Sequence, residues 1–327
     1  FPQNSEVSEI GKNSFSNSSI ERITIPKHVT RIGEESFKNC YCLETINFSE
    51  NSELKIIEKF AFAYSTIQNL TIPSCVSEIG EGWCYGTNDL TNIKVEELST
   101  KNVTCINSDF LLGKSDEKSD IYDILLFARR DIQKVEIPSD VKKIAHSAFD
   151  HCKQIESVEF NETCQIHTID DHSFSNTSLK KISIPKSVTK IGDYAFSCCI
   201  FLSSVEFERD SQLESIGICA FNHSLIEEIT IPQKVTRIGE SCFYFCKNLA
   251  KVLISENSEL QQIDNFCFSQ TAITEFTIPP LIRSIGIGAF LECKKLEKIK
   301  FSNLSKLEIL PDKTFSKTNI KQIQIPS

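Results

Sequence analysis

Several features common in proteins are missing from this sequence of 327 residues. There is no methionine and only one tryptophan, Trp83. No apolar run approaches the roughly 20 residues needed to cross a bilayer, so we expect no membrane insertion by this chain. Lysine and arginine (35) are mixed with aspartate and glutamate (44) at a net charge of -9. Without a basic stripe to neutralise phosphates, nucleic acid is excluded as a partner.

Motifs for catalysis and metal binding are also missing. The sequence contains no GxSxG, HExxH, P-loop, GxGxxG or CxxC segment. His146, Asp171 and His172 fall on neighbouring repeats, but nothing supplies a further ligand at a defined spacing, so we interpret them as surface residues. The sequence therefore predicts a protein that is not an enzyme and has no cofactor and no metal site.

The two ends of the sequence also allow predictions. It begins at Phe1 without an initiator methionine, so either a signal was removed or the sequence is an excerpt. It stops at Ser327, directly after a strand motif, and an uncovered last coil favours a natural chain that continues.

What the sequence does contain is a long repeat. The dipeptide Ile-Pro recurs every 47 residues, except for one interval of 65 that equals one period plus 18 inserted residues. Its isoleucines are Ile25, Ile72, Ile137, Ile184, Ile231, Ile278 and Ile325. Two phenylalanine series divide each period into coils of 25 and 22 residues, as the steps from Phe37 to Phe62 and from Phe221 to Phe243 show.

Each coil contains one short strand motif of the form apolar-x-x-apolar-x-apolar. In every second coil a proline then ends the strand, because it cannot donate the next ladder hydrogen bond. We expect thirteen strands, centred on residues 24, 47, 71, 94, 136, 159, 183, 206, 230, 253, 277, 300 and 324.

These coils must stack to be stable. Ordering one coil of about 23 residues costs on the order of 35 kcal/mol, whereas its six or seven apolar side chains return roughly 1.5–3 kcal/mol each. We therefore predict one curved solenoid domain over residues 1–327, with a parallel β-sheet on its concave face. Its convex face should carry short helical, 3-10 or irregular segments, and a β-hairpin should be inserted at about residues 99–130.

The fourteen cysteines do not read as a disulfide framework. Five of them recur three residues after a phenylalanine in alternate coils, too far apart to bridge, so we expect buried thiols there. These are Cys40, Cys152, Cys199, Cys246 and Cys293. Cys242 and Cys267 occupy equivalent places on adjacent coils, where a disulfide is geometrically allowed. Candidate N-glycosylation sites are Asn17, Asn47, Asn69, Asn102, Asn161, Asn176, Asn222 and Asn303.

The combined motif starting at Leu179, "LKKISIPKSVTKIGDYAFSCCIFLSSVEF", resembles the BspA-like, or Treponema-type, class of leucine-rich repeats. The paired coils look most like those of mucosal protozoan parasites such as trichomonads. The resemblance covers residues 7–327 and implies a leucine-rich-repeat solenoid that is secreted or displayed on the cell surface as an adhesin. The insertion also fits the family, with residues 110–112 and 124–127 pairing as a protruding hairpin. Trp83 and Cys84 depart from the motif just before it, and the chain contains no anchor.

Such a protein would bind a host cell-surface protein, a matrix protein or a glycan through the exposed strand face, the 105–128 hairpin, or both. The candidate face residues are Arg22, Asn47, Asn92, Lys94, Lys134, Glu136, Glu159, Lys181, Glu206, Glu228, Lys251, Glu275, Lys298 and Lys300. Alternatively, these exposed residues only keep the face solvated and bind no ligand. The alternative functions are a glycosylated surface coat or immune decoy without a specific partner, and an intracellular scaffold.

Overall fold

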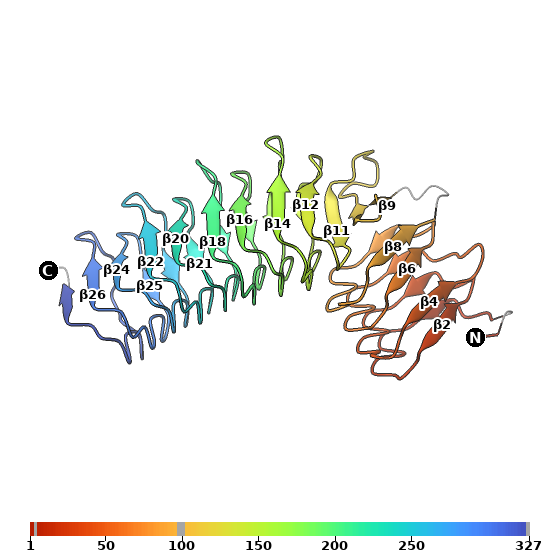
Figure 1. The fold of residues 1–327 in the computed structure, drawn as a ribbon, viewed down its shortest axis with the longest axis horizontal. Coiled ribbons are helices and arrows are strands. Elements are labelled where there is room, and N and C mark those ends of the chain that lie inside the picture. Colours follow the sequence, from red (N-terminus) through yellow and green to blue (C-terminus); the bar gives the residue numbers. More distant parts are fainter. Residues whose placement is uncertain (3–4, 97–101, 325–327) are drawn as a thin grey trace. The chain divides into compact units, whose positions relative to one another are not determined.

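The structure, a computed structural model, describes residues 1–2, 5–96 and 102–324. It divides into two compact units. Unit 1 comprises residues 1–132 and 143–154, and unit 2 comprises residues 133–142 and 155–327. Each unit is a stack of β-coils (Figure 1), and no helix occurs in the part of the chain that is described. A single domain over residues 1–327 stays a prediction.

All thirteen predicted strands are present, and we call them the broad strands. Along these strands inward apolar residues, most of them buried, alternate with outward ones, as in Arg22–Ile25, because successive side chains point to opposite faces. Unit 1 contains β2 (Arg22–Ile25), β4 (Thr45–Phe48), β6 (Asn69–Ile72) and β8 (Asn92–Val95). Unit 2 contains β12 (Lys134–Ile137), β14 (Ser157–Phe160), β16 (Lys181–Ile184), β18 (Ser204–Phe207), β20 (Glu228–Ile231), β22 (Lys251–Ile254), β24 (Glu275–Ile278), β26 (Lys298–Phe301) and β27 (Gln322–Gln324). Neighbouring coils pair in parallel, with Ser183 opposite Glu206 for example.

A second set of strands was not predicted. In most coils two residues at a repeated isoleucine form a narrow strand that pairs in parallel with that of an adjacent coil, as Ile191 does with Ile216. In unit 1 these are β1 (Glu9–Ile10), β3 (Arg31–Ile32), β5 (Ile56–Ile57), β7 (Glu78–Ile79) and β13 (Lys143–Ile144). In unit 2 they are β15 (Thr168–Ile169), β17 (Lys190–Ile191), β19 (Ser215–Ile216), β21 (Arg237–Ile238), β23 (Gln262–Ile263) and β25 (Ser284–Ile285). The connections that we expected to be helical or irregular are therefore narrow strands and turns.

Six-residue turns surround each phenylalanine position, and we call their succession the turn ribbon. In every one, the residues two before and two after this position adopt a left-handed backbone, as Asn13 and Asn17 do around Phe15. Such a conformation costs an ordinary residue roughly 1–2 kcal/mol. It also turns backbone N–H groups toward the next coil, so Asn13 donates to the Glu34 carbonyl at 3.0 Å and Asn17 to that of Lys38 at 2.8 Å. The inter-coil hydrogen bonds offset the strain.

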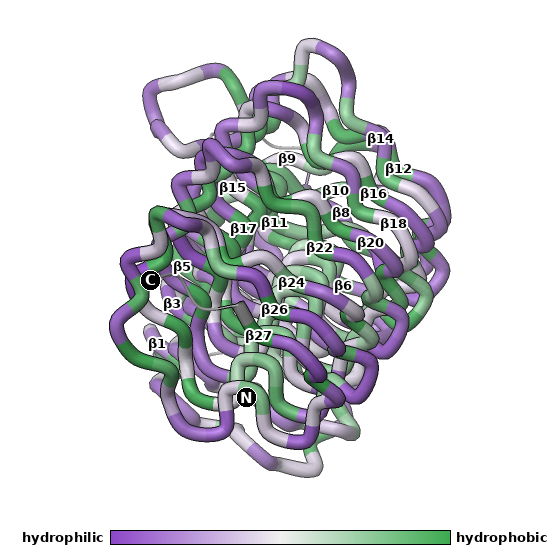
Figure 2. The backbone as a smooth tube through the Cα atoms, turned by 90° about the vertical axis from the view of Figure 1, so that its left-hand side faces the viewer, coloured by the Kyte–Doolittle hydropathy of each residue, from purple (hydrophilic) through white to green (hydrophobic). Residues whose placement is uncertain are grey.

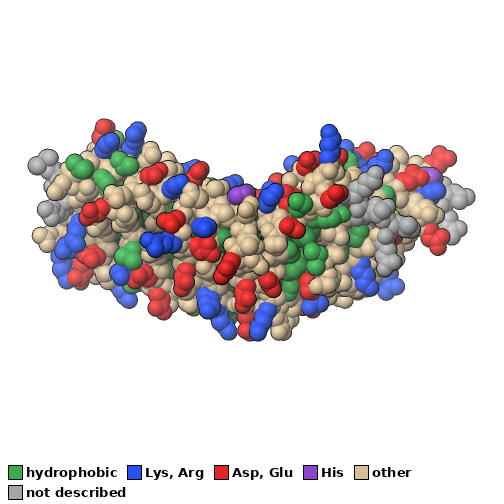
Figure 3. Space-filling model, turned by 90° about the horizontal axis from the view of Figure 1, so that it is seen from above, with side chains coloured by type: hydrophobic (Ala, Val, Ile, Leu, Met, Phe, Trp, Pro, Cys, Tyr) green, Lys and Arg blue, Asp and Glu red, His purple; other side chains and the backbone are tan. Residues whose placement is uncertain are grey.

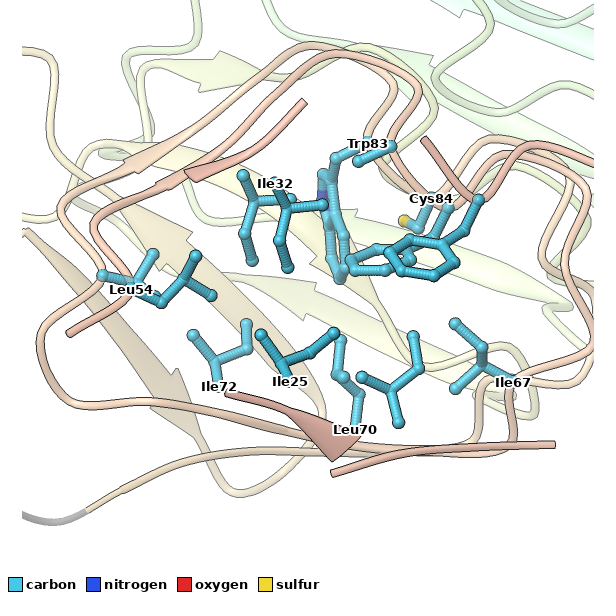
Figure 4. Close-up of a cluster of buried hydrophobic side chains, with 14 of the residues drawn as sticks. Ile25, Ile32, Leu54, Ile67, Leu70, Ile72, Trp83 and Cys84 are labelled. Atoms are coloured by element: carbon cyan, nitrogen blue, oxygen red, sulfur yellow. The ribbon is translucent and has the colours of Figure 1, made fainter. Parts of the chain in front are cut away.

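The repeated phenylalanines face inward. Phe174, Phe196, Phe221 and Phe243 are buried, and successive rings stack at 5.2–5.5 Å with nearly parallel planes. Green hydrophobic stretches alternate with purple hydrophilic ones along each coil (Figure 2). Figure 4 shows the core of unit 1, where Ile25 and Ile72 from broad strands face the narrow-strand Ile32.

The insertion does pair as predicted, but it does not protrude. β10 (Phe110–Gly113) is antiparallel to β11 (Ile124–Ala128) and also to β9 (Val103–Ile106). β11 then pairs in parallel with the narrow strand β13. Leu111 and Phe127 are fully buried because this three-stranded meander completes the core of unit 1. The exposed part is the loop at residues 115–121. Residues 99–101 of the predicted insertion lie outside the described part.

Candidate ligand-binding face

The broad strands position the candidate face. The first and third residues of each four-residue strand point outward, because the second and fourth point to the core, where the second is usually buried and the fourth is buried or half-buried. Of the fourteen predicted face residues, Lys300 is half-buried and the others are exposed. The repeat thus presents two side chains per coil on a regular grid, which allows one coil to be changed without disturbing its neighbours.

In unit 1 this face is largely uncharged. Asn47, Asn69 and Asn92 come from three neighbouring broad strands, and the Asn92 amide donates to the Asn69 amide oxygen at 3.1 Å. They line a hollow of about 230 Å³. The charged exceptions are Lys94, which is exposed, and Arg22, whose guanidinium lies 3.9 Å from the Glu44 carboxylate. Amide groups can both donate and accept, so this part suits polar, uncharged ligand groups.

In unit 2 the face carries charges of both signs. Lys251 pairs with Glu228 at 3.0 Å, and Lys300 pairs with Glu275 at 3.3 Å, each across two hydrogen-bonded strands. Such exposed pairs contribute roughly 0.2–1 kcal/mol each. Acidic and basic side chains are likewise interspersed over the side of the molecule that Figure 3 presents. This pattern favours selection of a partner by matching charges over general attraction.

Two hollows on the unit 2 face are lined by acidic residues. The larger, of about 710 Å³, lies between β18 and β20 and the loops after them, and includes Glu206, Glu208, Asp210 and Glu228. The smaller, of about 440 Å³, is lined by Glu136, Glu159 and residues 160–163. Sequence reasoning missed the loop residues Glu208 and Asp210, although the charged run after Phe207 was a signal for them.

The predicted glycosylation sites differ in accessibility. Asn17, Asn47, Asn69, Asn161 and Asn303 are exposed, whereas Asn102, Asn176 and Asn222 are half-buried. Asn17 and Asn176 occupy left-handed positions of the turn ribbon, which gives these asparagines a structural explanation. Asn161 lines the smaller hollow, and its amide oxygen accepts hydrogen bonds from the N–H and hydroxyl of Thr163 at 3.0 and 2.9 Å. A glycan there would compete with a ligand in that hollow.

The five repeated cysteines are buried free thiols, as predicted. The Cys199 Sγ lies 3.1 Å from the Phe174 carbonyl oxygen of the preceding coil, and Cys246 contacts Phe221 in the same way. Burial raises the pKa of Cys246 and Cys152 to about 11, and that of Cys84 to about 12. These thiols therefore stay protonated at neutral pH and are poor nucleophiles.

Cys242 and Cys267 are also free and fully buried. Their turns are adjacent, because Phe243 donates to the Cys267 carbonyl at 2.8 Å. Burial raises the pKa of both thiols well above the usual value, and the nearby Cys267 raises that of Cys242 further. A disulfide between them stays a prediction. No group of three or more His, Cys, Asp or Glu side chains suited to a metal ion occurs among the residues described.

Comparison with known proteins was informative at the level of family and fold. The sequence pattern of the family described as "BspA type Leucine rich repeat region (6 copies)" matches this chain over residues 8–118, 119–249 and 214–327. No functionally curated protein matches the chain. Within the described residues, the chain forms no helix with the length and apolar character that a membrane span requires.

Solved bacterial structures share the fold. A leucine-rich repeat protein from Eubacterium ventriosum has a TM-score of 0.64 at 21% identity, covering 94% of this chain and 83% of its own. One from Bacteroides ovatus has a TM-score of 0.59 at 24% identity, covering 99% and 77%. A leucine rich cell surface protein from Faecalibacterium prausnitzii has a TM-score of 0.58 at 23% identity, covering 93% and 67%. The finer resemblance to trichomonad proteins stays a prediction.

Proposed function

Because this chain belongs to the BspA-type leucine-rich repeat family, we propose that it is a secreted or surface-displayed binding protein. It captures a host cell-surface or matrix protein through the exposed face of its broad strands. A glycan is the other class of ligand that this polar face would suit. No catalytic step forms part of the proposal.

The observation that carries the proposal is the contrast between constant and variable positions of the repeat. The second residue of the broad strand is Ile, Leu, Val or Phe in every coil and is buried in most of them, as Ile182, Val205 and Ile229 show. The outward third residue changes from Glu159 to Ser183 to Glu206 in consecutive coils. A face needed only for solubility would not require hollows such as the one between β18 and β20.

The test is a binding measurement with the purified chain and matched variants. We expect saturable binding to host epithelial cells or to immobilised matrix proteins, and at least tenfold weaker binding after Glu206→Lys with Glu159→Lys. The control is Lys190→Glu, an exposed charge change on the narrow strand β17. Equal binding by the face variant and the wild type would contradict the proposed face.

The loop of the insertion needs its own variant. Deleting residues 106–127 would remove the buried Leu111 and Phe127, so it would test folding instead of binding. Replacing residues 116–121 by glycine and serine leaves Ser115 in place, whose N–H and hydroxyl both donate to the Asp123 carboxylate, at 2.8 and 2.6 Å. Weaker binding by this variant alone would assign recognition to the loop.

A glycosylated coat or decoy is the alternative function. It is favoured by exposed asparagines such as Asn47, Asn69 and Asn303. Competition by unlabelled protein separates the two functions, because a coat without a partner gives binding that is neither saturable nor competable. The intact mass of the native protein addresses the third alternative, since N-linked glycans require passage through the secretory pathway and would exclude an intracellular scaffold.

A further inference from the structure

Unit 2 exposes a small apolar cluster away from the broad-strand face. Ile200, Phe201 and Leu225 are exposed by 55%, 49% and 39%. They follow the turn ribbon on two neighbouring coils, where the Leu225 N–H donates to the Leu202 carbonyl at 2.9 Å. Single exposed apolar residues are ordinary on protein surfaces, whereas a contiguous group with polar surroundings indicates an interaction site.

The repeat itself shows that the fold does not need these side chains. At the places of Ile200 and Phe201, the next long coils carry Lys247 with Asn248, and Lys294 with Lys295. At the place of Leu225, other short coils carry small or polar residues, Thr66, Ser178, Ala272 and Asn319. The core contacts at this edge are made instead by the adjacent Leu202 and Ile226, which are fully buried. The apolar cluster therefore has no structural explanation within the repeat.

The same edge of unit 2 is basic, although the chain as a whole has a net charge of -9. We call it the lysine strip: the three or four residues between each turn and the following broad strand, at 178–180, 200–203, 225–227, 247–250, 272–274, 294–297 and 319–321. It contains five lysines, Lys180, Lys247, Lys294, Lys295 and Lys321, against two glutamates.

Several of these charges have defined surroundings. One of the two glutamates, Glu297, is paired with Lys321 at 2.9 Å. Lys247 lies over the ring of Phe245, with its ammonium 3.9 Å from the ring centroid. The strip therefore contains an apolar cluster at Ile200, Phe201 and Leu225, followed on later coils by the ammonium groups of Lys247, Lys294 and Lys295.

We propose that the lysine strip is a second binding surface, which takes an acidic segment of a partner protein that also carries apolar anchor residues. The anchors would pack on Ile200, Phe201 and Leu225, and the carboxylates would lie along Lys247, Lys294 and Lys295. Four coil steps separate β18 from β26, so the part of the strip from Ile200 to Lys295 extends for about 20 Å, the span of a short extended or helical segment. Charge matching would orient this segment, and the apolar contact would hold it.

The test is selection from a random 12-residue peptide phage library on the full chain. We expect selected peptides to be rich in Asp and Glu together with Leu, Phe or Trp, and to bind more weakly as salt is raised. The double change Ile200→Lys with Phe201→Asn installs the residues that the repeat places at 247 and 248, so it should preserve the fold. This double variant should bind the selected peptides at least tenfold more weakly than the wild type does.

A matched control makes the same change at the equivalent place in unit 1. Tyr41→Lys with Cys42→Asn alters two exposed residues and should leave binding unchanged. Circular dichroism and the urea midpoint verify that both double variants are folded. Selection of basic or neutral peptides, failure to enrich any peptide, or equal binding by the Ile200 and Phe201 variant would each overturn the proposal.

Two further measurements address other occupants of the strip. Cosedimentation with vesicles of phosphatidylserine and phosphatidylcholine that is lost in the Ile200 and Phe201 variant would assign the strip to a membrane surface. A dimer in analytical ultracentrifugation that is lost in the same variant would assign it to a second copy of this chain. Either result would overturn the acidic partner. Because none of these readouts uses the broad-strand face, their failure leaves the proposed function untouched.

Discussion

Unit 2 and the first coils of unit 1 are built on the same repeat, yet the two units preserve their cores differently. In unit 2 the rings of Phe174 through Phe315 form a stack in which each coil repeats the last. In unit 1 the stack ends at Phe62, where the Trp83 ring meets it edge-on at 6.2 Å and 83°. Trp83 then packs on Phe127 of the insertion at 5.8 Å. An aromatic column can therefore be continued by rings from non-equivalent positions.

The place in unit 1 where the phenylalanine stack is interrupted also contains a buried charge. Arg130 is almost fully buried and donates to the carbonyl oxygens of Thr87 and Ala148 at 3.1 and 3.0 Å. Asp150, also buried, accepts the Gly86 N–H at 3.0 Å. These side chains satisfy backbone groups that the next regular coil would otherwise pair. Unit 2 thus relies on repeated backbone bonds, whereas unit 1 relies on a few specific side chains at its interruption.

The largest expected effect is on the regular stack. Phe221→Ala should lower the free energy of unfolding by about 3–5 kcal/mol, because it removes a buried ring between two stacked neighbours. Phe15→Ala should cost less, since Phe15 is only half-buried. Urea unfolding monitored by circular dichroism measures both. Equal losses would mean that the burial of the ring does not decide its contribution to stability.

Next in size is the interruption in unit 1. Arg130→Ala should lower the free energy of unfolding by about 3 kcal/mol, because it leaves the Thr87 carbonyl without its donor and opens a cavity where the buried guanidinium lay. Hydrogen exchange should increase at residues 82–87 and 147–150 but not in unit 2. Arg129→Ala is the control, since Arg129 is partly exposed in its pairs with Asp109 and Asp131 and should cost less than about 1 kcal/mol. If the two arginines cost the same, the buried arrangement is not what stabilises the interruption.

Alkaline pH should affect the buried thiols of unit 2. The pKa of Cys246 is raised from 9.0 to about 11 by burial, so the folded state keeps its proton while the unfolded state loses it. Stability is therefore complete below pH 9 and falls as pH rises from 9 toward 11. At pH 10 the free energy of unfolding should be lower by about 1.4 kcal/mol because of this one thiol. Cys246→Ser should show a shallower decline in thermal unfolding between pH 8 and 10, and an unchanged decline would contradict this origin.

The smallest effect should come from the charged face of unit 2. Lys251→Ala breaks the exposed pair with Glu228 and should change stability by less than about 1 kcal/mol. Asn92→Ala on the neutral face of unit 1 provides the comparison, as it removes the hydrogen bond to Asn69. Urea midpoints measure both changes. A loss of several kcal/mol from either would mean that this face stabilises the fold and is not free for ligand binding.

Much of this architecture was readable from spacing. The apolar motif that recurs in every coil predicted all thirteen broad strands. The narrow strands could not be predicted, because two residues are too short to show an alternating pattern. One residue type in the sequence does reflect the close approach of neighbouring coils beside the narrow strands. A Cβ on Gly217 would lie 2.5 Å from the backbone of Gly192. Only a glycine fits there.

The linear repeat thus determined which side chains face inward and which strand positions face outward, because coils of nearly constant length place every equivalent residue in the same environment. The tertiary structure decided what happens where the period fails. Whether residues 103–128 protrude or complete the core depends on the space beside Trp83, and the burial of Arg130 depends on carbonyl groups far along the chain. Contacts of this kind form between segments that do not belong to the repeat, so they cannot be predicted from the spacing of residues in the sequence.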